Sequence, residues 1–146
     1  MLCVDNNSQQ LEQIKKDLSP LSANLTLIQA TSLQQAQKLI TDNNQFFSLI
    51  LCAQTLKDGD PLTLFKNAQC KLSQKIIYSP SPSLQKLIDL TNQGHIDYFL
   101  QLPYQAQEFR NIIQEQITEY TKNNAESDKS TETIVNKKVF RQMRTD

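Results

Sequence analysis

Polar residues that could do chemistry follow several apolar runs of this chain. Asp5 and Asn6 come directly after the run LCV, Ser79 follows IIY, and two further aspartates, Asp58 and Asp60, lie in the loop after LILCA. Carboxylate oxygens are the ligands that Mg²⁺ prefers, and a carboxylate can also act as a nucleophile. These are therefore the residues to weigh for metal or phosphoryl chemistry.

The other reactive side chains form no catalytic or metal-binding pattern. His95 is the only histidine, and no nucleophile or base in the sequence pairs with it. Cys3, Cys52 and Cys70 are odd in number and lack metal-ligand spacing, so we interpret them as reduced core residues. With only two glycines, the chain has no Gly-rich phosphate loop. These other side chains therefore predict no enzyme, no cofactor and no metal site of their own.

These side chains must be positioned by an alternating series of strands and helices that continues to residue 120. Short apolar runs predict five strands, at 1–4, 25–29, 48–52, 75–78 and 96–100. Between and after them, helical spacing predicts one buried face per helix. These faces are Leu11, Ile14 and Leu18; Leu33, Ala36, Leu39 and Ile40; Leu84, Leu87 and Ile88; and Phe109, Ile112, Ile113 and Ile117. The predicted fold class is α/β, a (βα)5 doubly wound five-stranded parallel sheet, with ligand chemistry at the carboxyl ends of the strands.

The strand ends LCVDNN, LILCAQTLKDGDP, IIYSPS and HIDYFLQLPY together resemble the response-regulator receiver family, from residue 1 to about residue 120. The likeness is best in the third and fifth segments. In the third segment the family has an aspartate, followed by a turn that contains Leu-Pro, Gly and Asp. In the fifth segment it has Lys-Pro followed by an aromatic residue. The resemblance implies a two-component signalling role, the flavodoxin-like strand order 2-1-3-4-5 and a cis peptide at Leu102–Pro103.

Placing the family's functional residues on this chain exposes losses at its phosphorylation site. The phosphoacceptor falls at Ala53, which has no carboxylate, and the acidic pair that binds magnesium becomes Asp5 and Asn6. The family's lysine falls at Leu102, which offers no charge or donor, whereas the switch hydroxyl survives as Ser79. The resemblance therefore implies a degenerate receiver that cannot be phosphorylated. We expect Ala53 and Leu102 to close the vacated pocket.

The same resemblance places the family's aromatic switch residue at Phe99, on the face formed by the fourth helix, fifth strand and fifth helix. Receivers usually dimerise or engage partners through this face. We therefore expect protein association centred on Phe99 and bordered by Leu87, Phe109 and Ile113, whose alternative role is core packing. Two other hypotheses stay open, a structural spacer in a larger signalling protein and a small-ligand binder in the strand-end crevice.

Charge and hydropathy limit the partners. Fifteen basic residues (Lys and Arg) against fifteen acidic residues (Asp and Glu) give a net charge of zero, so no overall field attracts nucleic acid or an anionic membrane. The longest apolar runs, such as 46–52, fall far short of the roughly 20 residues that cross a bilayer. A cytoplasmic protein with a protein partner is expected.

An abrupt change of composition after Tyr120 predicts a domain boundary. Residues 1–121 form the predicted receiver domain, and the polar run 122–133 predicts a linker. Residues 134–146 regain apolar side chains and are interpreted as the start of a further helix or of the next domain. Their pattern is similar to the opening of histidine-phosphotransfer domains, and a plain helical extension fits it as well.

Overall fold

The computed structural model describes residues 1–42, 46–80, 84–92 and 96–132. Its centre is a parallel sheet of five strands, β1 (Leu2–Val4), β2 (Ile28–Ala30), β3 (Leu49–Ala53), β4 (Gln74–Ser79) and β5 (Tyr98–Gln101). The strands lie in the order β2-β1-β3-β4-β5. The predicted α/β fold class and its flavodoxin-like order are therefore confirmed.

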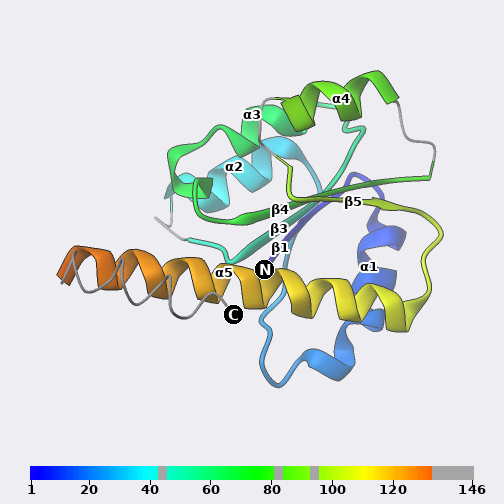
Figure 1. The fold of residues 1–146 in the computed structure, drawn as a ribbon. Helices are drawn as coiled ribbons and strands as arrows, with labels where there is room; N and C mark the ends of the chain where they lie inside the picture. The colour runs from blue at the N-terminus through cyan, green and yellow to red at the C-terminus, as the bar shows by residue number, and fades with distance from the viewer. Residues whose placement is uncertain (43–45, 81–83, 93–95, 133–146) are drawn as a thin grey trace.

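Helices cover both faces of this sheet. They are α1 (Ser8–Asp17), α2 (Leu33–Asp42), α3 (Pro61–Phe65), α4 (Leu84–Asn92) and α5 (Ala106–Glu132), with short 3₁₀ turns at Ser19–Leu21 and Ala68–Cys70. Figure 1 shows α1 and α5 on one side of the sheet and α2, α3 and α4 on the other. This doubly wound arrangement follows from right-handed crossovers between parallel strands.

The middle of the sheet is buried because helices cover it from both sides. Every residue of β1, β3 and β4 is buried. The cysteines Cys3, Cys52 and Cys70 are free and buried, as predicted. Burial raises the pKa of Cys3 to about 12 and that of Cys70 to about 11, so both remain protonated thiols near neutral pH.

The second strand begins later than the sequence predicts. The apolar run at 25–29 predicts a strand there, but β2 comprises Ile28–Ala30. The reason is the length of its partner, because Leu2–Val4 of β1 pair only with Ile28–Ala30. Leu25 and Leu27 still pack against the core, partly buried.

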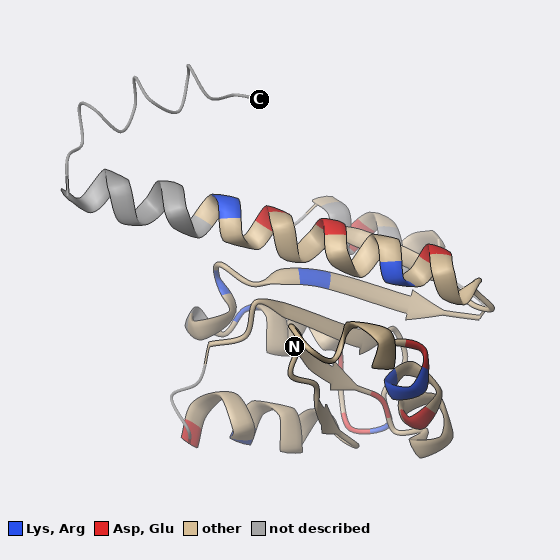
Figure 2. Ribbon diagram, turned by 90° about the horizontal axis from the view of Figure 1, so that it is seen from below, with Lys and Arg blue, Asp and Glu red and all other residues tan. Residues whose placement is uncertain are grey.

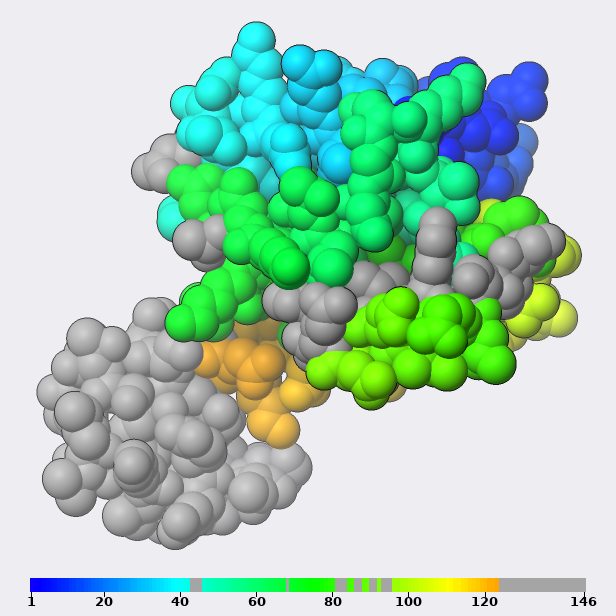
Figure 3. Space-filling model, turned by 90° about the horizontal axis from the view of Figure 1, so that it is seen from above, coloured from blue at the N-terminus to red at the C-terminus, as the bar shows by residue number. Residues whose placement is uncertain are grey.

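The predicted buried faces are confirmed for α1 and, apart from the partly buried Leu39, for α2, but not for α4. The buried residues of the first two helices are Leu11, Ile14, Leu33, Ala36 and Ile40. In α4, Leu84 is 70% exposed and Ile88 is 41% exposed, so the prediction that these two residues are buried was wrong. The neighbouring strand β5 is the sheet edge and has only four residues, which leaves α4 little sheet to cover. Figure 3 shows α4, in yellow-green, at the surface of this side of the molecule.

The last helix extends beyond the predicted boundary. Phe109, Ile112 and Ile113 are buried as predicted, and α5 then continues to Glu132 through most of the segment expected to be a linker. Adding residues to a helix costs little once its first turns are held in place. The division into domains stays a prediction, and residues 134–146 and His95 lie outside the described residues. None of the helices within the described ranges is long and apolar enough to cross a membrane.

Candidate functional site

A cavity of about 180 Å³ opens at the carboxyl ends of β1, β3 and β4. The strand order reverses between β1 and β3, and open α/β sheets bind ligands at such a point. Four of the predicted site residues line this cavity, namely Asp5, Ala53, Ser79 and Leu102. The other lining residues are Asn7, Gln10, Gln54, Thr55, Tyr78 and Pro80.

Asp5 is buried in the cavity wall, and both of its carboxylate oxygens accept hydrogen bonds. The Tyr78 hydroxyl donates to Oδ2 at 2.6 Å, and the backbone N–H of Asn7 donates to Oδ1 at 2.9 Å. Burial, followed by the hydrogen bond to Asp5, raises the pKa of Tyr78 far above its ordinary value. The phenol therefore stays protonated and acts as a donor to the carboxylate.

The register of the sheet explains how Tyr78 reaches Asp5 from a strand that is not adjacent. Val4 pairs with Cys52, so Asp5 follows in line with Ala53, and Ala53 in turn pairs with Tyr78. Side chains in one cross-strand row point to the same face of a sheet. Ala53 carries only a methyl group, so it leaves room for the phenol to reach the carboxylate. Tyr78 is not among the predicted site residues, and its one signal in the sequence is a hydroxyl-bearing aromatic residue at a strand end.

Asn6 connects its own loop, after β1, to the loops that follow β2 and β3. Its Nδ2 donates to the carbonyl oxygen of Thr31 at 2.8 Å, and its Oδ1 accepts the backbone N–H of Lys57 at 2.6 Å. Thr31 follows β2 and Lys57 follows β3, so this one amide joins the loops after three strands. Both ends of the Asn6 amide group are thus engaged in holding the backbone.

These residues do not fit the magnesium ion that binds to receivers with an intact acidic site. Mg²⁺ needs hard anionic oxygens in near-octahedral geometry. Among the residues that line the cavity Asp5 is the single carboxylate, and the one oxygen of the Asn6 side chain accepts the Lys57 N–H. No cluster of three His, Cys, Asp or Glu side chains in the part of the chain that the structure describes could hold a metal.

The turn after β3 uses its two aspartates to cap helices. The Asp58 carboxylate accepts the backbone N–H groups of Leu33 and Gln34 at the start of α2, at 3.1 and 2.9 Å. These bonds lower the pKa of Asp58. Asp60 caps α3 in the same way, through its side chain. Gly59 lies between them with φ +151°, and a Cβ atom there would lie 2.6 Å from Cδ2 of Leu33. This arrangement gives both aspartates structural roles.

Ala53 and Leu102 line the cavity without filling it, so the expectation that they close the pocket was wrong. Ala53 carries only a methyl group, and Leu102 is half-buried, so part of its side chain remains exposed. Leu102 is held through its backbone, because its N–H donates to the carbonyl oxygen of Ser79 at 2.9 Å. The Leu102–Pro103 peptide is cis, as the resemblance implies.

Of the residues predicted to contact a partner, two are core residues. Phe109 and Ile113 are fully buried, so the prediction that they border an interface was wrong, and the alternative role of core packing is correct. A helix that packs on a sheet needs one such apolar stripe. Phe99 is half-buried against the core, and the side chain of Leu87 lies outside the described residues.

Exposed apolar side chains do occur on α4 and β5, at other positions. Leu84 and Ile88 of α4 are exposed, and Tyr98 of β5 is 38% exposed. The sequence analysis assigned Leu84 and Ile88 to the core and did not single out Tyr98. We refer to Leu84, Ile88 and Tyr98 together as the α4–β5 patch, after the two elements that carry them.

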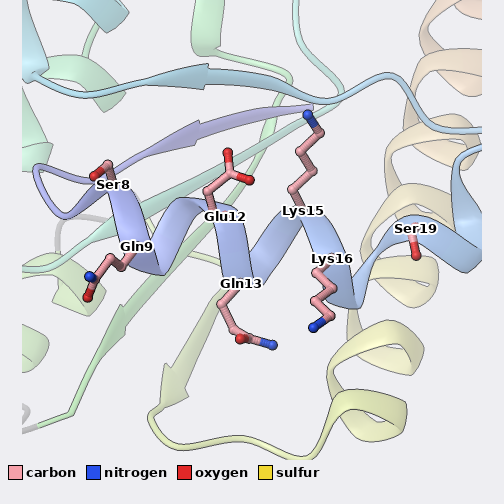
Figure 4. Close-up of a pocket in the computed structure, with 7 residues that line it drawn as sticks. All are labelled: Ser8, Gln9, Glu12, Gln13, Lys15, Lys16 and Ser19. Atoms are coloured by element: carbon pink, nitrogen blue, oxygen red, sulfur yellow. The ribbon is translucent and has the colours of Figure 1, made fainter.

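A larger and shallower hollow runs along α1. Figure 4 shows seven residues that line it, Ser8, Gln9, Glu12, Gln13, Lys15, Lys16 and Ser19. All seven are exposed, and all come from α1 and the turn that follows it. No buried group points to a ligand there, so the cavity at the strand ends is the better candidate site.

Comparison with known proteins gives similar folds and no close relative. No protein-family model matches the chain, and comparison with curated protein sequences gives no significant match. The chain is similar to a signal receiver domain of an HD domain-containing protein from Pseudomonas fluorescens Pf-5, with 25% identity, a TM-score of 0.75, and 85% and 90% of the two chains covered.

Two other solved structures share the fold. A CheY-like response regulator receiver domain protein from Methanospirillum hungatei JF-1 has 22% identity and a TM-score of 0.71, over 84% of this chain and 95% of that one. The beryllofluoride-activated NtrC4 receiver domain, solved as a dimer in solution, has 21% identity and a TM-score of 0.68, over 82% and 96% of the two chains. At these identities the likeness shows a shared fold.

Proposed function

We propose that this chain, whose fold is that of response-regulator receiver domains, is a signalling module that binds proteins and does not accept a phosphoryl group. The observation that carries the proposal is the row Asp5, Ala53 and Tyr78. Ala53 has no carboxylate to phosphorylate, and its neighbour Asp5 is hydrogen-bonded to the Tyr78 phenol. The module acts without catalysis. A two-component or hybrid-kinase setting and a cytoplasmic location belong to the same proposal.

Phosphoryl donors are expected to leave the protein unmodified. Ala53, Asn6 and Leu102 supply neither the nucleophile, nor the metal ligand, nor the cation that an acyl phosphate requires. After incubation with magnesium and acetyl phosphate, the intact mass should be unchanged, and beryllofluoride should cause no saturable shift of amide NMR signals. A phosphorylatable receiver treated with the same reagents is the positive control. A stoichiometric adduct on any aspartate of this chain would refute the proposal.

Without a phosphoryl group, a receiver has no differential interaction to move it between two states. The module would then hold one binding surface permanently. The α4–β5 patch is the best candidate for this surface, because Leu84, Ile88 and Tyr98 expose apolar area that the core does not use. Along α5, Figure 2 shows acidic and basic residues interspersed, so no block of one charge repels a second copy.

The proposed partner at the α4–β5 patch is a second copy of the chain, and the similar NtrC4 receiver domain is itself a dimer. The double variant Leu84→Gln, Ile88→Gln is expected to weaken self-association at least tenfold, because the interface loses two apolar side chains. Sedimentation over a range of concentrations measures the effect. Leu72→Gln is the matched control, since Leu72 is 51% exposed but lies before β4, outside the patch. A wild type that stays monomeric at every concentration would favour the spacer hypothesis instead.

A further inference from the structure

We infer that the strand-end cavity binds a small organic molecule through a primary ammonium group, with the Asp5 carboxylate as its counter-ion. The inference goes beyond the proposed function, which needs no ligand. It depends on the contacts of Asp5, on the charges around the cavity, and on the size and chemistry of its lining.

Asp5 carries a buried charge, and within the described ranges its hydrogen-bond partners include no cation. It is 7% exposed, and its carboxylate accepts from the Tyr78 hydroxyl and the Asn7 N–H, which are both neutral donors. Buried carboxylates are usually paired with a cation. A carboxylate has about four acceptor positions, so two donors leave capacity for more hydrogen bonds on the cavity side.

The charge of Asp5 acts at this end of the sheet. Cys52 precedes Ala53 in β3 and is fully buried. Burial raises the pKa of Cys52, and the Asp5 carboxylate raises it further. The Asp5 charge favours a positively charged group in the cavity over a neutral or negative one.

The rest of the lining suits an ammonium group better than a divalent metal ion. Apart from Asp5, the polar side chains at the cavity are hydroxyls and amides, from Asn7, Gln10, Gln54, Thr55, Tyr78 and Ser79. Protein magnesium sites usually combine one or two carboxylates with anionic groups of a substrate in near-octahedral geometry, and this lining offers the single carboxylate of Asp5. A primary ammonium group needs one counter-charge and donates up to three hydrogen bonds, which hydroxyl and amide oxygens can accept.

The size of the cavity limits the ligand to a small molecule. Its volume of about 180 Å³ equals that of about six water molecules in the liquid. Polar atoms on the ligand next to the ammonium group would meet the Thr55 and Ser79 hydroxyls and the Gln54 amide, which all line the cavity. The ligand class is therefore a short amine that also carries a hydroxyl or similar polar group.

Ethanolamine is the probe for this inference, and ethylene glycol is its neutral counterpart of similar size. Titration of the full chain at neutral pH, where a primary amine is protonated, is followed by amide NMR. We expect saturable shifts at millimolar ethanolamine for Asn7, Ala53, Gln54 and Leu102, and at least tenfold weaker binding of ethylene glycol. Equal affinity for the two probes, or no saturable shift with ethanolamine, would overturn the inference. Saturable shifts of the same amides with magnesium chloride alone would assign the cavity to a metal ion instead.

Two variants test the role of Asp5. Asp5→Asn removes the charge and keeps an oxygen for the Tyr78 hydrogen bond, and it should weaken ethanolamine binding at least tenfold. Asp58→Asn is the matched control, because this carboxylate caps α2 and does not line the cavity, and it should leave the affinity within twofold. Unchanged affinity in a folded Asp5→Asn variant would refute the inference. If the Asp5→Asn variant does not fold, the affinities of the wild type for ethanolamine and ethylene glycol test the inference instead.

Discussion

Replacement of Phe109 by alanine is expected to lower the free energy of unfolding by about 3–5 kcal/mol, the range for truncating a buried phenylalanine. The ring is 0% exposed, and it stacks on Tyr104 with centroids 4.3 Å apart. Tyr104 in turn donates to the Asp17 carboxylate at the end of α1, at 2.6 Å. The truncation therefore leaves a cavity and also loosens the contact between α5 and α1. Urea denaturation measures the change.

Two further variants separate the core role of Phe109 from an interface role. Phe109→Leu keeps part of the apolar volume but loses the ring stacked on Tyr104, so it should cost less than Phe109→Ala. Leu84→Ala, at a side chain that is 70% exposed, should change the free energy of unfolding by no more than about 0.5 kcal/mol. A Phe109→Ala variant as stable as the wild type would mean that this ring is not part of the core.

The Ala53→Asp variant is expected to lose about 1–3 kcal/mol of stability near neutral pH, the cost of an unpaired charge in a partly buried site. The new carboxylate would stand in one row with Asp5 and Tyr78, with no cation nearby in that row. Like charges at short range raise each other's pKa. Thermal melting at pH 5 and pH 8 measures the effect.

The sign of the pH dependence follows from that raised pKa. When the folded pKa of a carboxylate lies above its unfolded value of about 3.9, the folded state binds more protons between the two values. Stability is then lost as pH rises through the folded pKa and recovered as pH falls. The deficit of Ala53→Asp should be larger at pH 8 than at pH 5. Ala53→Asn is the control, because asparagine has the shape of aspartate without its charge, and its stability should depend little on pH. Equal losses of stability in the two variants would point to a steric cause.

Much of the fold could be predicted because its determinants are local. Each central strand is covered on both faces, so it is a short apolar run, and each covering helix has an apolar stripe. The errors arose at the edge of the sheet and at the end of the chain. Leu84 and Ile88 have the spacing of a buried face but lie beside the four-residue edge strand β5. The polar run after Tyr120 is helical because it continues a helix already packed on the sheet.

The candidate site was predicted in position but not in detail. Four of the five residues assigned to the phosphorylation site do line one cavity, because strand ends in a parallel sheet meet at one edge. The hydrogen bond between Tyr78 and Asp5 joins residues 73 positions apart on strands that do not pair. This hydrogen bond depends on the strand register and on the small residue Ala53 between the two side chains. The hydrophobic periodicity of the sequence reveals neither.

Because Asn6 makes two hydrogen bonds to neighbouring loops, the order of the substitutions would matter if a magnesium site were engineered into this cavity. An aspartate at position 6 could still accept the Lys57 N–H, but it has no N–H to donate to Thr31, so the loop after β2 would lose one of its contacts. If Asn6→Asp were introduced first, the contact between the two loops would be weakened before a bound metal could stabilise them. A workable route would first brace the loop after β2 by another contact, and only then exchange Asn6.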